Sequence, residues 1–270
     1  MATASSSRLV LAGGGHAHLY TLAHADAFAA RGISTVLVSP SRYQYYSGMG
    51  PGLLSGQYEP EQTRVDIAEL ITAKGGTFVE DRVKTIRPAG QQLELASGAT
   101  LRYDRVSFNT GSRVPVERIE GAAEHAVPVK PVENLEHTCS VIRDALQRGR
   151  TSVTVIGGGA AAVELAASVW RLAQTHHGDA EITLIFSGET LLSEHSSRAG
   201  KLAERSLAKR GIRLQRSSRV TAVKRDAAVT DSGEEYPHDV ALLAAGIVPA
   251  DIFVNSPIPC ADDNALLVNR

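Results

Sequence analysis

The chain has 270 residues, of which 43% are hydrophobic, and its formal net charge is −1. This length supports one large domain or two interlocked domains with a sizeable core. The near-neutral balance, without a long run of one sign, excludes the clustered basic surface of a nucleic-acid-binding protein. Cys139 and Cys260 form no C-x-x-C motif, which argues against a disulfide framework and fits a reducing, cytoplasmic compartment.

Neither a membrane-spanning helix nor a metal site is expected. No apolar stretch reaches about 18 residues, and Met1–Ser7 lacks the basic start and long apolar region of a signal peptide. Peripheral contact with a membrane stays open. The nine histidines occur without an H-E-x-x-H motif, and no C-x-x-C motif accompanies them, so no structural metal is predicted.

The first elements follow a β-α-β order. Apolar residues 8–12 predict a buried parallel strand that runs directly into a glycine run starting at Gly13. Residues 16–31 have helical spacing, and Gly32 stands where a helix commonly ends. Residues 34–39 predict the next strand. A glycine-rich loop in such a unit is typical of nucleotide binding.

The pattern then changes. Residues 40–62 are irregular and rich in Tyr, Gly and Ser, and residues 65–74 look helical. Short strands are expected at 78–79, 83–86, 93–95, 100–101 and 106–108. Residues 115–150 begin as a proline-containing linker and end in an amphipathic helix at 133–148.

The second half repeats the order of the first. A strand at 152–156 leads into a second glycine run, starting at Gly157, and a helix at 160–174. Further elements are expected as strands at 181–186, 213–216, 219–224, 227–231 and 239–244, and a helix at 196–210. Ser196 or Ser197 is the expected N-cap of that last helix. The repetition predicts a duplicated α/β architecture rather than a solenoid.

Each glycine loop has the chemistry of an anion site. The first N–H groups of a helix are unpaired and carry partial positive charge, so a pyrophosphate gains hydrogen bonds and field there. Glycines let the backbone approach the phosphates without an intervening Cβ. The first two glycine positions are filled by Gly13 and Gly15 in one loop and by Gly157 and Gly159 in the other, and Ala162 fits the third. A turn that binds nothing is the alternative for either loop.

Several residues depart from the usual dinucleotide pattern. His18 takes the third glycine position of the first loop, where it would push the helix away from the strand or face the cofactor. Ser39 and Ser187 end the strands after which an acidic residue normally holds the ribose. Glu189 is a candidate for that role or a solvated loop charge. Because no Lys or Arg lies between Ser187 and Arg198 to receive a 2′-phosphate, NADH is favoured over NADPH.

The two loops, with the N-T-G run at 109–111 and the A-A-G run at 244–246, resemble the pyridine nucleotide–disulfide oxidoreductase superfamily. In that superfamily the first loop binds FAD and the second binds NAD(P)H. The runs at 13–18, 46–52 and 129–131 look like those of the NADH dehydrogenase-like flavoprotein found fused to selenide, water dikinase. Type II NADH dehydrogenases and sulfide:quinone oxidoreductases are similar at lower specificity.

This resemblance implies an α/β fold of two interlocked Rossmann-like (three-layer ββα/βαβ) dinucleotide-binding domains. It divides the chain into the first part of an FAD-binding domain, a linker and helix, an NAD(P)H-binding domain, and a truncated return toward the FAD domain. The corresponding ranges are 1–114, 115–150, 151–247 and 248–270.

The resemblance also assigns site residues by position. The FAD site would use Gly13, Gly14, Gly15, His16, Ala17, Ser39, Pro40, Arg42, Ser47, Gly48, Met49, Val83, Thr110 and Gly111. The NAD(P)H site would use Gly157, Gly159, Ala160, Ala161, Ser187 and Gly246. Lys130 and Glu164 are the candidate catalytic residues. Lys130 would lie beside the isoalloxazine or be a solvated loop lysine, and Glu164 would face the nicotinamide or neutralise its helix end. The tyrosines at 43–46 would stack on the flavin or pack on the core.

The chain also departs from members of the superfamily. Disulfide reductases need a close cysteine pair beside the flavin, and the segment after Ser39 has none, so that activity is excluded. Cys139 is expected to be a small buried hydrophobe and Cys260 to be more exposed, which gives little support for sulfide chemistry. The chain ends at Arg270, before the G-D pair and the C-terminal domain that the resemblance implies. Retention of FAD, the electron acceptor and a homodimeric state therefore stay open.

Together these features predict an oxidoreductase that passes electrons from NAD(P)H through FAD to a quinone or another small acceptor. It would be cytoplasmic, at most peripheral to a membrane. The alternative is a catalytically silent nucleotide-binding fragment or a regulatory remnant of such a flavoprotein.

Overall fold

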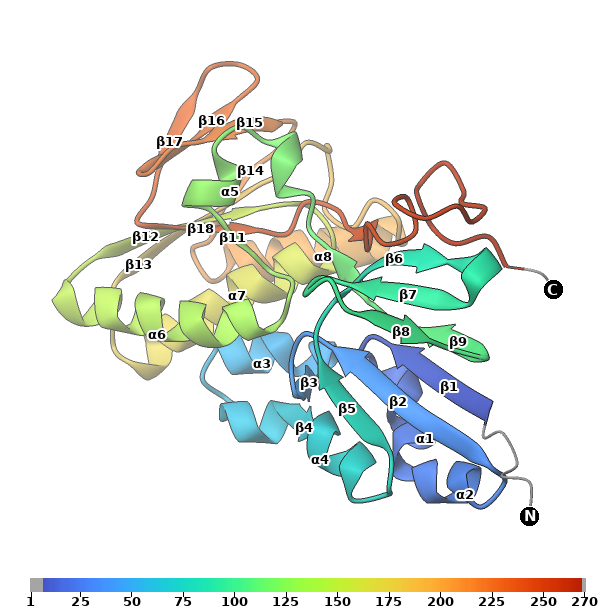
Figure 1. The fold of residues 1–270 in the computed structure, drawn as a ribbon. Coiled ribbons are helices and arrows are strands. Elements are labelled where there is room, and N and C mark those ends of the chain that lie inside the picture. The colour runs from blue at the N-terminus through green and yellow to red at the C-terminus, as the bar shows by residue number, and fades with distance from the viewer. Residues whose placement is uncertain (1–6, 269–270) are drawn as a thin grey trace, which may run out of the picture. The chain divides into compact units, whose positions relative to one another are not determined.

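The computed structural model describes residues 7–268 (Figure 1). The expectations for the extreme termini, residues 1–6 and 269–270, lie outside the described residues. The chain forms two compact units, and each is discontinuous in sequence. Unit 1 comprises Met1–Tyr45, Arg64–Arg113 and Val248–Arg270, and unit 2 comprises Tyr46–Thr63 and Val114–Ile247. The contiguous ranges that the resemblance assigns to FAD and NAD(P)H remain predictions.

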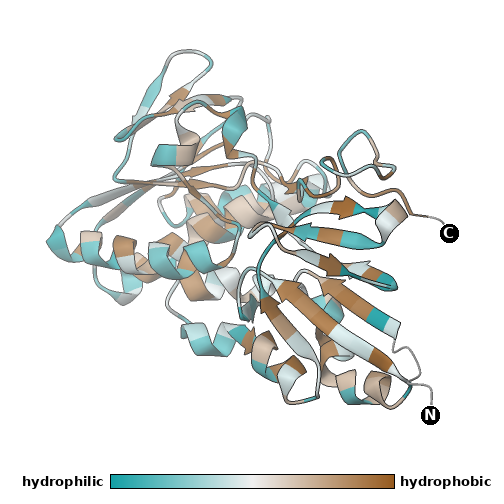
Figure 2. Ribbon diagram, in the orientation of Figure 1, coloured by the Kyte–Doolittle hydropathy of each residue, from teal (hydrophilic) through white to brown (hydrophobic). Residues whose placement is uncertain are grey.

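Unit 1 is built on a parallel sheet in the order β5-β2-β1-β9. Its strands are β1 Ser7–Ala12, β2 Ile33–Ser39, β5 Thr77–Glu80 and β9 Arg105–Phe108. An antiparallel sheet of β6 Val83–Arg87, β7 Gln92–Leu95 and β8 Thr100–Arg102 accompanies it. Strand residues alternate between the two faces of the sheet. Because both faces are covered, β1 and β2 need apolar residues on both. Figure 2 shows these strands as mostly hydrophobic.

The two faces of this sheet build two separate cores. Leu11 and Leu37 point to one face and pack with Leu22, Ile67 and Ile71 of the helices. The opposite face packs against the antiparallel sheet through Val10, Ala12, Val36, Val38, Val83, Ile86, Leu93 and Leu95. Unit 1 therefore has three layers, of helix, parallel sheet and antiparallel sheet (Figure 1).

The helix predicted over residues 16–31 is wrong as a single element. The chain forms a 3-10 turn at His16–His18, then α1 Leu19–Ala23 and α2 Ala25–Ala29. The break lies at His24, whose ring Nδ1 donates to the Tyr20 carbonyl at 2.7 Å and whose ring stacks on the Tyr20 ring. The side chain thereby takes the carbonyl that the helical N–H of residue 24 would have used.

The segment that was predicted as irregular contains short elements. Residues 40–62 include β3 Tyr43–Tyr45, a 3-10 turn at Ser47–Met49 and α3 Gly50–Leu54, and a second 3-10 turn spans Pro60–Thr63. The helix predicted at 65–74 is shorter, because β4 Arg64–Asp66 pairs with β3 and α4 is Ile67–Thr72. Further short elements not predicted are β10 Ser112–Arg113, α5 Ala122–His125, β11 Val127–Pro128, β17 Glu235–Pro237 and β19 Val248–Pro249.

Unit 2 has a parallel sheet in the order β11-β18-β12-β13-β14. Its remaining strands are β12 Thr151–Ile156, β13 Ala180–Ile185, β14 Arg213–Gln215 and β18 Val240–Leu243. Helices α6 Glu133–Arg148, α7 Ala160–Thr175 and α8 Ser197–Ala208 accompany it, together with an antiparallel sheet of β15 Val220–Val223, β16 Ala227–Thr230 and β17.

The predicted helices of unit 2 are confirmed closely. Helix α6 has the predicted bounds, and α8 begins where Ser196 Oγ accepts the Ala199 N–H at 3.3 Å, as an N-cap should. Strands β12 and β18 are almost completely buried because helices and strands cover both faces (Figure 1). Two parallel sheets with flanking layers confirm the predicted α/β class. Among residues 7–268, no helix is long and apolar enough to cross a membrane.

One buried histidine makes the stability of unit 2 sensitive to acid. His238 is 5% exposed, and neither of its ring nitrogens has a hydrogen-bond partner. Burial lowers the pKa of His238 below its ordinary 6.5. As the pH falls through that ordinary pKa, the unfolded chain takes up a proton that the folded chain excludes, so the free energy of unfolding decreases.

We expect His238→Leu to flatten this acid dependence between about pH 5 and pH 8. At neutral pH the substitution should keep or raise the free energy of unfolding, by about 1 kcal/mol, because it removes two unpartnered polar atoms. Urea unfolding at several pH values measures both effects. His137→Gln, on the exposed side of α6, is the control. An acid dependence in His238→Leu equal to that of the wild type would contradict the assignment.

Candidate functional site

The first glycine loop is shaped by close backbone approach. Gly13 follows β1 with a φ of +94°, and a Cβ on it would lie 2.3 Å from the carbonyl oxygen of Asn109. The Gly13 N–H donates to Val38 at 2.8 Å, and the Gly15 N–H donates to Asn109 at 3.2 Å. The loop is therefore held between the carboxyl ends of β1, β2 and β9, and only glycine fits at position 13.

Asn109 also covers the second glycine position of this loop. A Cβ on Gly15 would lie 2.3 Å from the Asn109 side-chain amide. The Asn109 amide group thus fills the space beside Gly15, where it can donate or accept a hydrogen bond. The sequence pattern placed Asn109 in a turn and did not name it as a site residue. Its signal was an amide directly after β9, a strand of the same sheet as β1.

His18 does not face outward. Its side chain is 4% exposed and lies beneath the loop. Nδ1 donates to the Gly13 carbonyl at 2.8 Å, and Nε2 lies 3.0 Å from the hydroxyl of Ser107 on β9. Because a carbonyl only accepts, the neutral ring then accepts from Ser107. Burial lowers the pKa of His18, which favours this neutral form.

The remaining predicted FAD positions of unit 1 lie on the same edge of the sheet. They directly follow the carboxyl ends of its four strands, where α/β proteins bind their ligands. His16 and Ala17 follow β1, Ser39 and Pro40 end and follow β2, Val83 follows β5, and Thr110 and Gly111 follow β9. Ser39 is buried, with its hydroxyl beside Gly14, and the Val83 side chain belongs to the core, which leaves its backbone for any ligand.

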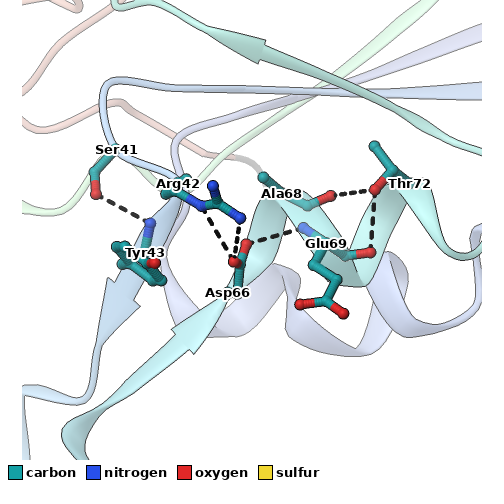
Figure 3. Close-up of polar contacts among 7 residues, drawn as sticks. All are labelled: Ser41, Arg42, Tyr43, Asp66, Ala68, Glu69 and Thr72. Atoms are coloured by element: carbon teal, nitrogen blue, oxygen red, sulfur yellow. Dashed lines mark hydrogen bonds and ion pairs between the residues drawn. The ribbon is translucent and has the colours of Figure 1, made fainter. Parts of the chain in front are cut away.

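Arg42 has a partner inside the chain. Figure 3 shows its guanidinium against Asp66, with Nε at 3.1 Å and a terminal nitrogen at 2.5 Å from one carboxylate oxygen. The other oxygen of Asp66 accepts the Glu69 N–H at 2.9 Å and caps α4. Although burial acts against it, this N–H and the guanidinium hold the pKa of Asp66 below its ordinary value. The Arg42 side chain is 53% exposed and that of Asp66 20%, so we assign the pair little stability.

A hollow of about 470 Å³ lies beside this pair, between α4 and β5. It is lined by Arg42, Ala68, Glu69, Thr72, Phe78 and Glu80. Arg42 therefore borders an open recess while it remains bonded to Asp66. Its predicted contact with FAD stays a prediction.

In the second glycine loop, Gly157 and Gly159 differ in how closely other atoms approach them. Gly157 has a φ of +140°, and a Cβ there would lie 2.5 Å from the Ala244 carbonyl. Gly159, in contrast, has an extended backbone with φ −83°, and a Cβ would meet no atom within 4 Å. Packing of the chain thus requires Gly157 but not Gly159. An open cradle at the N-terminus of the 16-residue helix α7 fits a pyrophosphate.

The other predicted positions of unit 2 lie at the carboxyl edge of its parallel sheet. Ala160, Ala161 and Glu164 are exposed on the first turns of α7, and Ser187 is exposed after β13. Gly246, with a φ of +75°, follows β18, and Lys130 follows β11. Ser47, Gly48 and Met49 also belong to unit 2, where α3 packs on α6 and α7. They therefore share a compact unit with Gly157 rather than with Gly13.

The two cysteines are alike in exposure. Both are free and half-buried, so the expectations of a buried Cys139 and a more exposed Cys260 are wrong. Burial raises the pKa of the Cys139 thiol, which makes it a poor nucleophile at neutral pH.

The contrast between Gly157 and Gly159 is testable. Gly157→Ala should lower the free energy of unfolding by about 2 kcal/mol or more, because it combines a strained φ with a backbone clash. Gly159→Ala should cost no more than about 1 kcal/mol, since alanine is only a poorer N-cap than glycine. It should nevertheless weaken NADH binding about tenfold or more. Urea unfolding and calorimetric titration measure the two effects. Equal losses of stability in Gly157→Ala and Gly159→Ala would contradict the conclusion that packing requires only Gly157.

Comparison with known proteins places the chain. The family model for pyridine nucleotide-disulphide oxidoreductases matches residues 7–270. The ferredoxin–NAD(+) reductase component of the biphenyl dioxygenase system of Paraburkholderia xenovorans is 26% identical, over 77% of this chain and 50% of its own length. The alternative NAD(P)H-ubiquinone oxidoreductase C1 of Arabidopsis thaliana is 28% identical, over 60% of this chain and 35% of its own length.

A solved structure shows the same fold. NDH2 from Plasmodium falciparum, in complex with NADH, has a TM-score of 0.82 at 15% identity and covers 94% of this chain and 58% of its own. The chain thus spans half or less of the two curated relatives' lengths. The family match extends over almost the whole sequence, including both glycine loops. The chain belongs to the pyridine nucleotide-disulphide oxidoreductase family.

Proposed function

We propose that this protein is a flavin-dependent NAD(P)H oxidoreductase. One observation carries the proposal: a glycine loop whose first glycine has a positive φ follows a strand of each parallel sheet, β1 in unit 1 and β12 in unit 2. In each loop the first glycine makes room for a backbone carbonyl of a neighbouring strand's end. Two dinucleotide sites in one chain are what electron transfer between two cofactors requires.

The first loop is proposed to hold FAD. The loop from Gly13 to Ala17 would cradle the pyrophosphate, with the Asn109 amide beside it. Since the helix behind this loop is short and broken at His24, its field is weaker than that of a long helix, and direct hydrogen bonds carry more of the binding. Thr110 and Gly111 extend the same edge of the sheet.

The second loop is proposed to hold the nicotinamide nucleotide. The open cradle at Gly159 lies at the start of α7, whose 16 residues align their peptide dipoles toward the bound phosphates. Glu164 is exposed on that helix and Lys130 follows β11 at the same sheet edge. We propose that they contact the reacting rings. A bound FAD would supply the redox chemistry between the nicotinamide and an acceptor.

The acceptor is proposed to be a quinone or another small molecule. The curated relatives include an NAD(P)H-ubiquinone oxidoreductase and a ferredoxin–NAD(+) reductase component, which use different acceptors. Within the family we propose a likeness to the NADH dehydrogenase-like flavoprotein found fused to selenide, water dikinase, because of the G-G-G-H-A-H and Y-S-G-M-G-P-G runs. We also propose a cytoplasmic location, with membrane contact that is at most peripheral. The protein is proposed to form a homodimer.

An absorption spectrum tests the proposed function. The purified protein, reconstituted with FAD, should show flavin bands that bleach when NADH or NADPH is added under anaerobic conditions. A quinone should then restore them. A protein that gains no flavin on reconstitution contradicts the proposal. A protein that binds flavin and nucleotide without bleaching supports the alternative, a silent nucleotide-binding chain.

A further inference from the structure

The ribose end of the nicotinamide site lies after β13. In Rossmann-like sheets the residue that ends this strand contacts the 2′ position of the adenosine ribose, where an acid selects NADH and a nearby Arg accommodates the phosphate of NADPH. Here Ser187 holds that position, and it is exposed. The segment from Ser187 to Leu191 carries no basic residue. The charge of this subsite therefore depends on what the fold places next to it.

The fold places Arg216 there. Strand β14 pairs with β13 in a register that aligns Gln215 with Ile185, so the residues that follow run alongside each other. The Ser217 N–H donates to the Gly188 carbonyl at 3.0 Å, and the Ser218 N–H donates to the Phe186 carbonyl at 3.1 Å. Residues 216–218 thus flank residues 186–188, although the two segments are well separated in sequence.

Glu204 fixes the position of this arginine. A terminal nitrogen of Arg216 lies 2.9 Å from one oxygen of the Glu204 carboxylate, and the other oxygen accepts the Leu191 N–H at 3.2 Å. The Glu204 side chain is 13% exposed, whereas that of Arg216 is 50% exposed. The Glu204 carboxylate therefore links Arg216 to Leu191, at the end of the segment that follows β13. A guanidinium has five N–H donors, so donors remain for a phosphate.

We propose that Arg216 is the 2′-phosphate-binding residue of this site and that the chain accepts NADPH. The inference rests on the proposed nicotinamide site. A planar guanidinium suits a phosphate better than a hydroxyl, and Ser187 provides no carboxylate to repel one. Glu204 orients the arginine, and the exposed Glu189 is the opposing charge within the loop. The proposal is opposed to the expectation of NADH that rests on residues 187–198.

Binding of nucleotide fragments tests the proposal without flavin. Calorimetric titration of the full chain with 2′,5′-ADP, 5′-AMP, NADPH and NADH separates the phosphate from the rest of the ligand. Arg216→Gln should weaken 2′,5′-ADP and NADPH by about tenfold or more, and should change 5′-AMP and NADH by less than about twofold. Arg213→Gln is the matched control, because Arg213 lies on β14, just before Arg216, but pairs with Glu181. It should leave all four affinities unchanged.

A second variant covers the case in which Arg216→Gln does not fold. Glu204→Gln removes the competing anion and should strengthen NADPH binding about twofold or more while NADH binding is unchanged. A wild-type chain that binds NADH but binds NADPH about tenfold more weakly overturns this inference alone. Equal losses of NADH and NADPH in Arg216→Gln also overturn it. A wild-type chain that binds neither nucleotide overturns this inference together with the proposed function.

Discussion

Both glycine loops depend on one constraint, the close approach of two backbone segments. It acts at the end of β1 in unit 1 and at the end of β12 in unit 2. In each unit a carbonyl from a neighbouring strand's end, Asn109 or Ala244, occupies the space where a side chain of the first glycine would lie. The absence of a Cβ lets the chain turn there, while the glycine N–H bonds to a neighbouring strand, Gly13 to Val38 and Gly157 to Ile185. The same constraint acts twice, because the two parallel sheets carry the same local connection.

The two loops meet this constraint with different supports. In unit 2 the small Ala162 lets a long helix pack close to the strand, and the helix dipole is available to the ligand. In unit 1 a histidine stands at the corresponding place, and its ring fills the space beneath the loop while it bonds to Gly13 and Ser107. A buried, neutral imidazole thereby replaces close helix packing with hydrogen bonds, and the helix behind it is short.

Charges near the sites come from residues that are distant in sequence. Arg42 is paired with Asp66, which lies on β4 and caps α4, so a residue assigned to cofactor binding also helps to secure the helix start (Figure 3). At the other site, Glu204 on α8 and Arg216 after β14 meet beside the loop that follows β13. The antiparallel pairing of β3 with β4 brings Arg42 beside Asp66, and the parallel pairing of β13 with β14 brings Arg216 beside the loop after β13.

The sequence by itself determined the α/β class, the two glycine loops and the long helices of unit 2, because their signals are local. Apolar runs, glycine at a turn, and the helical spacing of residues 133–148 each depend on neighbours within a few positions. Only the tertiary structure showed the long-range and side-chain contacts that override these local signals. The His24 ring ends a helix by taking a backbone carbonyl, β3 shortens α4 by pairing with β4, and strand register brings Arg216 to Phe186. Such contacts join residues whose separation in sequence carries no periodic signal, so only the folded chain reveals them.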